Sequence, residues 1–273
     1  MKPVVYTTLY AGYGSSPYIA MVILNIISVR IRNGDIPYVV FDYSQNREVA
    51  DRLEAWQKLL SFDVRPLVHE DLERPYDIQD IWHLMFDALL HVSPEDPIGE
   101  TFVFSDADAV FLDDPVELAK GDFAYRLPHR PSARFAICSW LACFNLSRPE
   151  TRRLLALTYS LKQPAHRWQP WEHMTSRKLG IPTSESCLEV AIQLLGRDGF
   201  EPILFSTADR YQLHYAHHNK HQFDSMLELL NVLLTKSPWR DRYYEEFGSL
   251  RAIMYRENTL FRTIEADKRR AVV

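Results

Sequence analysis

The N-terminal part of the chain alternates between short apolar runs and longer segments of helical length, and few folds accommodate that pattern. Strands rich in β-branched and aromatic residues are expected at residues 4–9, 37–41, 64–68 and 101–104. Helices are expected between them, at residues 18–32, 46–60 and 78–92. Strands and helices in strict alternation are typical of a mostly parallel sheet with helices on its faces. The sequence therefore predicts an α/β fold.

The regularity weakens after residue 115. A buried strand is expected within residues 135–146 and a helix at residues 148–161. Two amphipathic helices are expected near the C-terminus, at residues 223–235 and 240–263. We therefore predict a catalytic domain over residues 1–221 and a helical C-terminal extension over residues 222–273 that packs on the same domain.

Composition narrows the classes of function. The 273 residues are 47% hydrophobic, which is enough for a large core, and 31 Lys and Arg against 36 Asp and Glu give a net charge of −5. This mild acidity argues against a broad nucleic-acid surface. The three cysteines are an odd number without a Cys-x-x-Cys pair, so a reducing, cytoplasmic location is expected. No transmembrane segment or export signal is expected, since the most apolar run, residues 18–29, contains Asn25 and is too short to span a bilayer.

Two carboxylates follow the strand expected at residues 101–104. Asp106 and Asp108 would then lie at the carboxyl end of a parallel strand, where ligands bind in open α/β sheets. If the chain stays extended there, residues two apart point to the same side, so both carboxylates can face one cation. Carboxylate oxygens favour Mg²⁺ or Mn²⁺. The alternative interpretation is a solvated turn after a strand.

An EF-hand is a second alternative for the same segment. Glu117 occupies the twelfth position counted from Asp106, as the motif requires. However, Val110 replaces an oxygen ligand, and Phe111 replaces the glycine that the sharp turn needs. The EF-hand is therefore excluded.

The same segment resembles the GT-A type glycosyltransferases, particularly their retaining, glycogenin-like and galactosyltransferase-like branch. In that branch an apolar strand leads into an Asp-x-Asp motif, here Asp106-Ala107-Asp108, and the resemblance extends over residues 4–221. It implies a Rossmann-like, mostly parallel sheet flanked by helices, and a uridine diphosphate (UDP) sugar as the donor. It also implies Mn²⁺ or Mg²⁺ as the cofactor. Thr8, Tyr10 and Tyr13 resemble the first strand and loop that hold the base and ribose of the donor.

A second part of the resemblance lies in residues 213–221. In the family, a His six residues before a Lys is the third protein ligand of the metal, and the Lys binds the diphosphate. His214 and Lys220 have that spacing, although His217 stands where the family usually has Gly. The resemblance thus implies a metal site of Asp106, Asp108 and His214, with Lys220 as a donor-binding and catalytic residue. Without the resemblance, this His-rich segment is equally well interpreted as an exposed polar loop, or as neighbouring histidines that bind metal adventitiously.

Glu185 falls where the family places an Asp-Gln pair facing the sugar. A carboxylate at this position could hold a sugar hydroxyl or act as a general base, so Glu185 is a candidate catalytic residue. The alternative is an ordinary helix start, with Ser184 as the N-cap and Glu in the first turn. Asp42 has a similar pair of interpretations, as a contact to the donor nucleoside or as the acceptor of an Asx turn.

The function expected from these features is metal-dependent transfer of a sugar to an acceptor hydroxyl, with retention at the anomeric carbon. A glycan, a lipid-linked sugar, a protein, a natural product or a modified nucleobase is compatible as the acceptor. One alternative is a nucleotidyltransferase, although residues 12–15 have the glycines of a phosphate loop without its basic residues. Another is a non-catalytic nucleotide-sugar-binding module. The C-terminal helices are also candidates for a homo-oligomer contact.

Overall fold

The computed structural model describes the chain in ten stretches, some of them as backbone only. These are residues 4–10, 16–70, 78–93, 95–114, 123–126, 138–161, 184–200, 203–205, 212–214 and 223–256. Helices and strands alternate along the N-terminal half, which confirms the α/β class. The predicted domain boundary at residues 221/222 falls outside the described stretches and stays a prediction.

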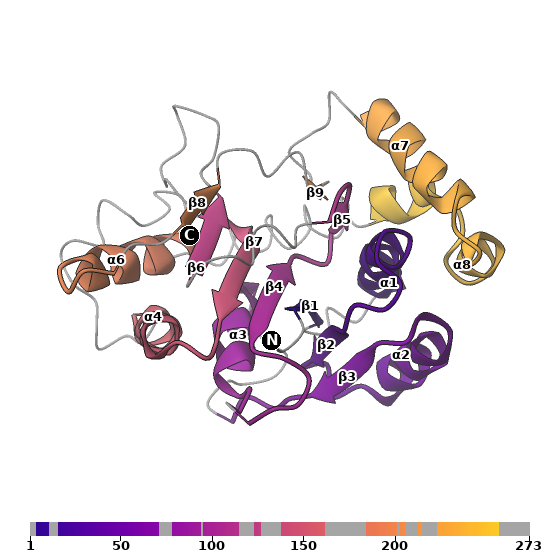
Figure 1. Cartoon of the computed structure of the whole chain (residues 1–273). Coiled ribbons are helices and arrows are strands. Elements are labelled where there is room, and N and C mark those ends of the chain that lie inside the picture. The colour runs from indigo at the N-terminus through magenta and orange to yellow at the C-terminus, as the bar shows by residue number, and fades with distance from the viewer. Residues whose placement is uncertain are drawn as a thin grey trace, which may run out of the picture.

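The centre of the molecule is a mixed sheet (Figure 1). Among the described strands, seven form this sheet in the order β3-β2-β1-β4-β7-β6-β8. Their bounds are β1 Val4–Tyr10, β2 Tyr38–Asp42, β3 Asp63–Pro66, β4 Thr101–Ser105, β6 Phe123–Arg126, β7 Cys138–Asn145 and β8 Ile203–Phe205. Strand β7 is antiparallel to its neighbours β4 and β6, and the other described pairs within this seven-stranded sheet are parallel. The carboxyl ends of β1, β2 and β4 therefore meet at one edge.

Helices cover both faces of this sheet (Figure 1). One face carries α1 (Ser16–Arg30) and α2 (Arg47–Leu60), and α7 (Phe223–Thr235) and α8 (Arg240–Phe247) join the same core beyond α1. The other carries α3 (Ile78–Leu90), α4 (Pro149–Ser160) and α6 (Ser184–Gly196). The alternation of strand side chains produces this division, since Tyr38 and Val40 pack in the first core and Val39 and Phe41 in the second.

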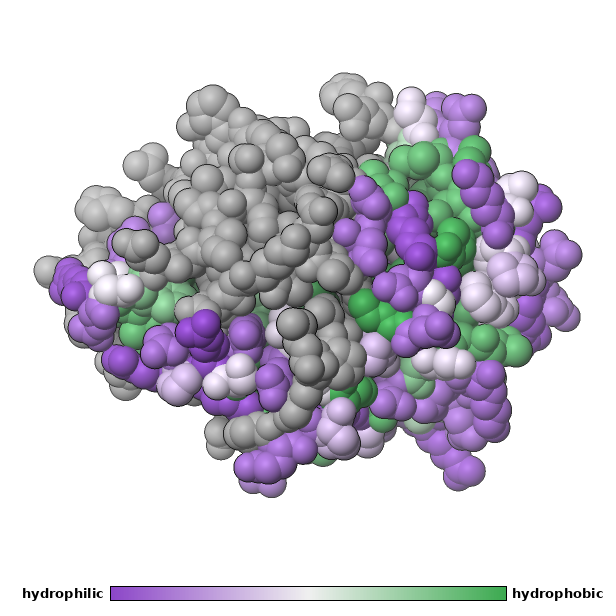
Figure 2. Space-filling model, in the orientation of Figure 1, coloured by the Kyte–Doolittle hydropathy of each residue, from purple (hydrophilic) through white to green (hydrophobic). Residues whose placement is uncertain are grey.

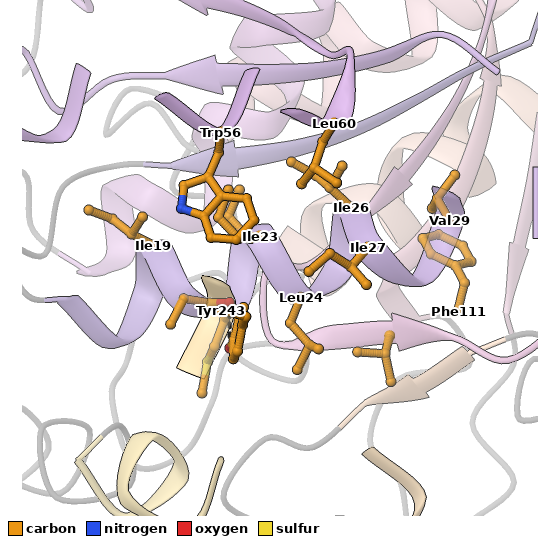
Figure 3. Close-up of a cluster of buried hydrophobic side chains, with 14 of the residues drawn as sticks. Ile19, Ile23, Leu24, Ile26, Ile27, Val29, Trp56, Leu60, Phe111 and Tyr243 are labelled. Carbon is orange, nitrogen blue, oxygen red and sulfur yellow. Dashed lines mark hydrogen bonds between the residues drawn. The ribbon is translucent and has the colours of Figure 1, made fainter. Parts of the chain in front are cut away.

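Helix α1 is buried on all sides. Every residue from 19 to 30 is buried, as expected for a helix that is apolar around its whole circumference. Figure 3 shows α1 between Trp56 and Leu60 of α2 and the rings of Tyr243 and Phe111. The buried Arg30 ties the end of α1 to the end of α2, because its guanidinium donates to the carbonyls of Ile36, Leu60 and Ser61, each at 2.6 Å.

The helix predicted at residues 240–263 is wrong in its length. Helix α8 ends at Phe247, and a separate helical segment begins at residue 250. Gly248 causes the break, since its φ of 81° and ψ of −165° are essentially confined to glycine. Its N–H donates to the carbonyl of Tyr244 at 3.0 Å and closes the last turn. Residues 257–263 of the prediction lie outside the described stretches.

The described part of the surface in Figure 2 is mostly hydrophilic, with apolar residues gathered near α7. Leu229 and Val232 of α7 are 41% and 48% exposed. Cys143 and Cys187 are both buried, and burial raises the pKa of the Cys143 thiol to about 12. Among the helices that the structure describes, none has the length and hydropathy needed to cross a lipid bilayer.

Candidate active site

The Asp106-Ala107-Asp108 motif forms a tight turn directly after β4. The N–H of Ala109 donates to the carbonyl of Asp106 at 3.3 Å, which closes a four-residue turn. The expectation of an extended chain here is wrong, and the two carboxylates occupy the first and third positions of a turn instead. Neither Ala107 nor Asp108 has a positive φ, so this turn needs no glycine. Both Asp side chains are partly exposed at the carboxyl edge of the sheet.

A short antiparallel pair brings a distant segment to this turn. Strand β5 (Ala109–Phe111) pairs with β9 (Gln212–His214), and in their register Ala109 lies opposite His214. The backbone of His214 is therefore beside the residue that follows Asp108, although a hundred residues separate them along the chain. The His214 side chain lies outside what the structure describes. Sequence reasoning chose His214 and missed the strands, because three residues are too few to display a periodicity.

Strand β1 contains two of the predicted donor-binding residues, Thr8 and Tyr10, and ends at the same edge. It is parallel to β4, with Thr7 opposite Phe104, so Thr8 and Tyr10 follow toward the carboxyl end. On its other side, Tyr10 lies opposite Asp42 of β2. The backbones of Thr8 and Tyr10 are described, and the side chains of these two residues are not.

Asp42 adopts the turn that the sequence offered as an alternative. Its carboxylate accepts from the Ser44 N–H at 2.8 Å, as in an Asx turn, and the side chain is buried. This contact uses one carboxylate oxygen to stabilise the chain reversal after β2. A role for Asp42 in donor binding therefore has less support than the turn.

Of the three remaining predicted residues, the structure describes Glu185. Glu185 is in the first turn of α6, partly buried, on the face of the sheet that carries α3 and α4. Its position agrees with the ordinary helix start, and its catalytic role stays a prediction. Tyr13 and Lys220 lie outside the described residues.

The residues gathered at this edge are chemically suited to a divalent cation. Two carboxylates and one imidazole would together offer hard oxygen ligands and a borderline nitrogen ligand, a combination that Mn²⁺ accepts. Among the side chains that the structure describes, no three His, Cys, Asp or Glu residues form such a group, and the His214 side chain is outside that set. The fit therefore rests on residue types and on backbone register.

The C-terminal part of α1 and the residues just after it are attached to the chain beyond β5. The amide of Asn33 donates to the Asp114 carboxylate at 3.2 Å. Burial lowers the pKa of the Arg32 guanidinium, and the nearby Asp113 carboxylate acts in the opposite direction. These contacts connect the residues just after α1 with the chain that follows β5.

Sequence reasoning missed the polar residues of α1 that reach the turn. Asn25 and Ser28 are both fully buried in an otherwise apolar helix and hydrogen-bond to Ser105, Asp106 and Phe111. The signal was available, because a polar side chain in a helix that is apolar all round needs a buried partner. The sequence does not show which residues are those partners.

Comparisons with known proteins agree with the fold. No protein-family model matches the sequence, and no curated protein matches it. The glycosyltransferase GlyE of Streptococcus pneumoniae TIGR4 has a similar structure, with a TM-score of 0.50 and 12% identity. That alignment covers 97% of this chain and 64% of the GlyE chain, so this chain spans less than two thirds of the longer protein. A second match is a glycosyltransferase involved in the glycosylation of the major capsid of PBCV-1, with a TM-score of 0.48, 10% identity and coverage of 83% and 99%.

At this level of identity the likeness to GlyE concerns the fold. The chain has the mixed α/β architecture of a glycosyltransferase fold, as the resemblance of its sequence implies. The chemistry has to be argued from the turn at Asp106–Ala109 and from the segments that converge on it.

Proposed function

We propose that the protein is a metal-dependent glycosyltransferase of the GT-A type. It would transfer a sugar from a nucleoside diphosphate sugar, with a UDP-sugar as the favoured donor, to an acceptor hydroxyl. The support comes from a glycosyltransferase-like fold together with an Asp-Ala-Asp turn at the carboxyl edge of its sheet.

One observation carries the proposal, namely the register of β5 with β9. This pairing sets Ala109 opposite His214, so the segment proposed to supply the imidazole runs beside the Asp106–Ala109 turn. A solvated turn without function does not require a distant His-rich segment to pair with it. Because the two segments are far apart in the sequence, their pairing supports a shared role at this site.

Each predicted residue then has a chemical task. Asp106, Asp108 and His214 are the proposed ligands of the divalent ion, which supplies Lewis-acid stabilisation of negative charge on a diphosphate when it is bound. Thr8, Tyr10 and Tyr13 are the proposed contacts to the nucleoside. The Lys220 ammonium is proposed to donate to the diphosphate as charge develops on it.

The proposal extends to stereochemistry and to Glu185. Retention is favoured by the resemblance of the Asp106-Ala107-Asp108 motif to the glycogenin-like branch. In such a transfer, Glu185 would hold a sugar hydroxyl and orient the donor. The acceptor would be a hydroxyl compound that binds at the same edge of the sheet.

The test is release of UDP from UDP-sugars. We expect the purified protein with Mn²⁺ to hydrolyse at least one UDP-sugar slowly without an acceptor, and EDTA to abolish this release. Asp108→Asn should lower the rate by about a hundredfold or more, since it removes a charged ligand of the ion while conserving shape. A chromatographic assay of free UDP measures both effects.

Asp51→Asn is the matched control for this experiment. It makes the same chemical change at an exposed carboxylate of α2 that pairs with Arg47 on the same helix. Its rate should equal that of the unsubstituted protein. UDP release that resists EDTA, or that is equal in Asp108→Asn and Asp51→Asn, would contradict the proposal.

A further inference from the structure

Asn25 connects helix α1 to the Asp106–Ala109 turn through a fully buried amide. Its Nδ2 donates to the Ser105 hydroxyl at 2.7 Å and to the Asp106 carbonyl at 3.1 Å. Its Oδ1 accepts from the Tyr38 hydroxyl at 2.7 Å. Both amide hydrogens and the amide oxygen are therefore engaged, in a side chain with an exposed fraction of 0%.

These partners determine which way the amide faces. The Asp106 carbonyl can only accept, so it requires the NH₂ end of Asn25. Burial raises the pKa of Tyr38, which keeps its hydroxyl protonated and able to donate to the oxygen end. A flipped amide would place its oxygen against the Asp106 carbonyl oxygen. Tyr38 therefore sets the orientation of Asn25, and Asn25 sets the position of the peptide that follows Asp106.

The Asp106 carbonyl is the point where these contacts converge. It accepts from the Asn25 amide at 3.1 Å, from the Ser105 hydroxyl at 3.0 Å and from the Ala109 N–H at 3.3 Å. The last of these bonds closes the turn, and the first comes from a different element. The conformation of the turn that displays Asp106 and Asp108 is thus coupled to α1.

Ser28, one helical turn after Asn25, holds the other end of the same segment. Its hydroxyl donates to the Asn25 carbonyl at 2.6 Å and accepts from the Phe111 N–H at 2.8 Å. Residues three apart lie on the same face of a helix, so one face of α1 contacts both β5 and the turn before it. Figure 3 shows Val29 of this helix beside Phe111.

We propose that Asn25, oriented by Tyr38, is a positioning residue that holds the Asp106–Ala109 turn in the conformation required for cation binding. The part of this inference that concerns the cation rests on the proposed function. The part that concerns the turn does not, because it follows from hydrogen bonds between described residues. Outer partners of this kind orient ligands without touching the ion.

The experiment compares Tyr38→Phe with Tyr243→Phe. Both tyrosines are buried, and both donate one hydroxyl hydrogen bond to α1, Tyr38 to the Asn25 side chain and Tyr243 to the Ala20 carbonyl at 2.9 Å. Both variants therefore lose a phenolic hydroxyl. Only Tyr38→Phe loses a hydrogen bond that leads through Asn25 to the turn. Asn25→Ala is the stronger variant, and Tyr38→Phe keeps the test valid if Asn25→Ala does not fold.

Two measurements are made on each full-length variant. Amide hydrogen exchange by mass spectrometry follows peptides over residues 105–112, which include the N–H groups of Ala109 and Phe111. Binding of Mn²⁺ alone is measured by electron paramagnetic resonance. Tyr38→Phe should raise exchange in this segment roughly two- to tenfold over Tyr243→Phe. It should also weaken Mn²⁺ binding, and Asn25→Ala should weaken it by about tenfold.

Each outcome decides one part of the inference. Equal exchange over residues 105–112 in Tyr38→Phe and Tyr243→Phe would overturn the positioning of the turn. Faster exchange with unchanged Mn²⁺ affinity would overturn its role in cation binding. If the unsubstituted protein does not bind Mn²⁺, the metal-dependent function and the cation part of the inference fail together, and the exchange measurement still decides the positioning of the turn.

Discussion

At the scale of single residues, two buried polar side chains determine how α1 is joined to its surroundings. Asn25 fixes the turn after β4, and Arg30 satisfies the carbonyls at the end of α2. Leaving such groups buried without partners would cost free energy, so each one specifies its neighbours. The apolar residues around them contribute most of the buried surface, and their packing tolerates more variation in geometry.

Asn25→Asp tests the hydrogen-bond assignment through pH. An ionised carboxylate at this position would direct an oxygen with no proton at the Asp106 carbonyl, and burial also disfavours its charge. The pKa of the introduced carboxyl should therefore be raised in the folded protein above its unfolded value of about 3.9. Relative to the unsubstituted protein, the free energy of unfolding should decrease by about 1.4 kcal/mol per pH unit between the two pKa values.

Urea denaturation of both proteins over a series of pH values measures this difference. The sign follows from proton binding, because a raised pKa means that the folded state binds more protons than the unfolded state as pH increases. A stability difference that stays constant with pH would show that Asn25 does not direct its NH₂ group at the Asp106 carbonyl.

At the scale of secondary-structure elements, Gly248 determines where the C-terminal helices turn. Gly248→Ala should destabilise the protein by about 1–3 kcal/mol, because alanine does not tolerate this combination of φ and ψ. Space is not the cause, since among the described residues an added Cβ would meet only the end of Arg256 at 3.8 Å, an ordinary contact. The free energy of unfolding in urea gives the measurement.

Gly196→Ala is the matched control for Gly248→Ala. Gly196 is the last residue of α6, its φ is not positive, and no atom of the part of the chain that the structure describes lies within 4 Å of an added Cβ. Alanine there should stabilise the protein by roughly 0.4–1 kcal/mol. Equal effects of the two substitutions would contradict the backbone explanation for the end of α8.

The elements also show which features could be predicted from sequence. Helix α7 has the predicted limits, residues 223–235, because its amphipathic pattern spans more than three turns. The helix after residue 240 was predicted as continuous, since a glycine inside a helical pattern does not by itself reveal a positive φ. The turn at Asp106–Ala109 was interpreted as extended, because residue types alone do not show a bond between residues three apart.

Part of the candidate site could also be predicted from the sequence. Asp106 and Asp108 were chosen from their place after an apolar strand, and β4 ends at Ser105 as that reasoning requires. His214 depended on resemblance to a family, because no local pattern links it to residues a hundred positions earlier. Asn25 and Tyr38 were missed, since the sequence does not show which buried polar groups face each other.

At the scale of the whole molecule, the C-terminal helices share a core with the N-terminal part of the chain. Tyr243 of α8 donates to the Ala20 carbonyl of α1, and Trp56 of α2 donates to Glu246 at 3.1 Å. The rings of Trp56 and Phe247 stack with centroids 6.0 Å apart. The C-terminal helices thus help to enclose α1, the helix that contacts the candidate site.

The pairing of β5 with β9, which places the backbone of His214 beside the Asp106–Ala109 turn, is also a property of the whole molecule. Coordination of Mn²⁺ is the most direct test of the metal site proposed there. The protein with Mn²⁺ and UDP should give a nitrogen hyperfine coupling from a bound imidazole in pulsed electron paramagnetic resonance. This coupling should disappear in His214→Ala, and Asp108→Asn should weaken binding of the ion. A nitrogen coupling that persists in His214→Ala, or Mn²⁺ that binds equally well without the Asp108 carboxylate, would contradict the proposed metal site.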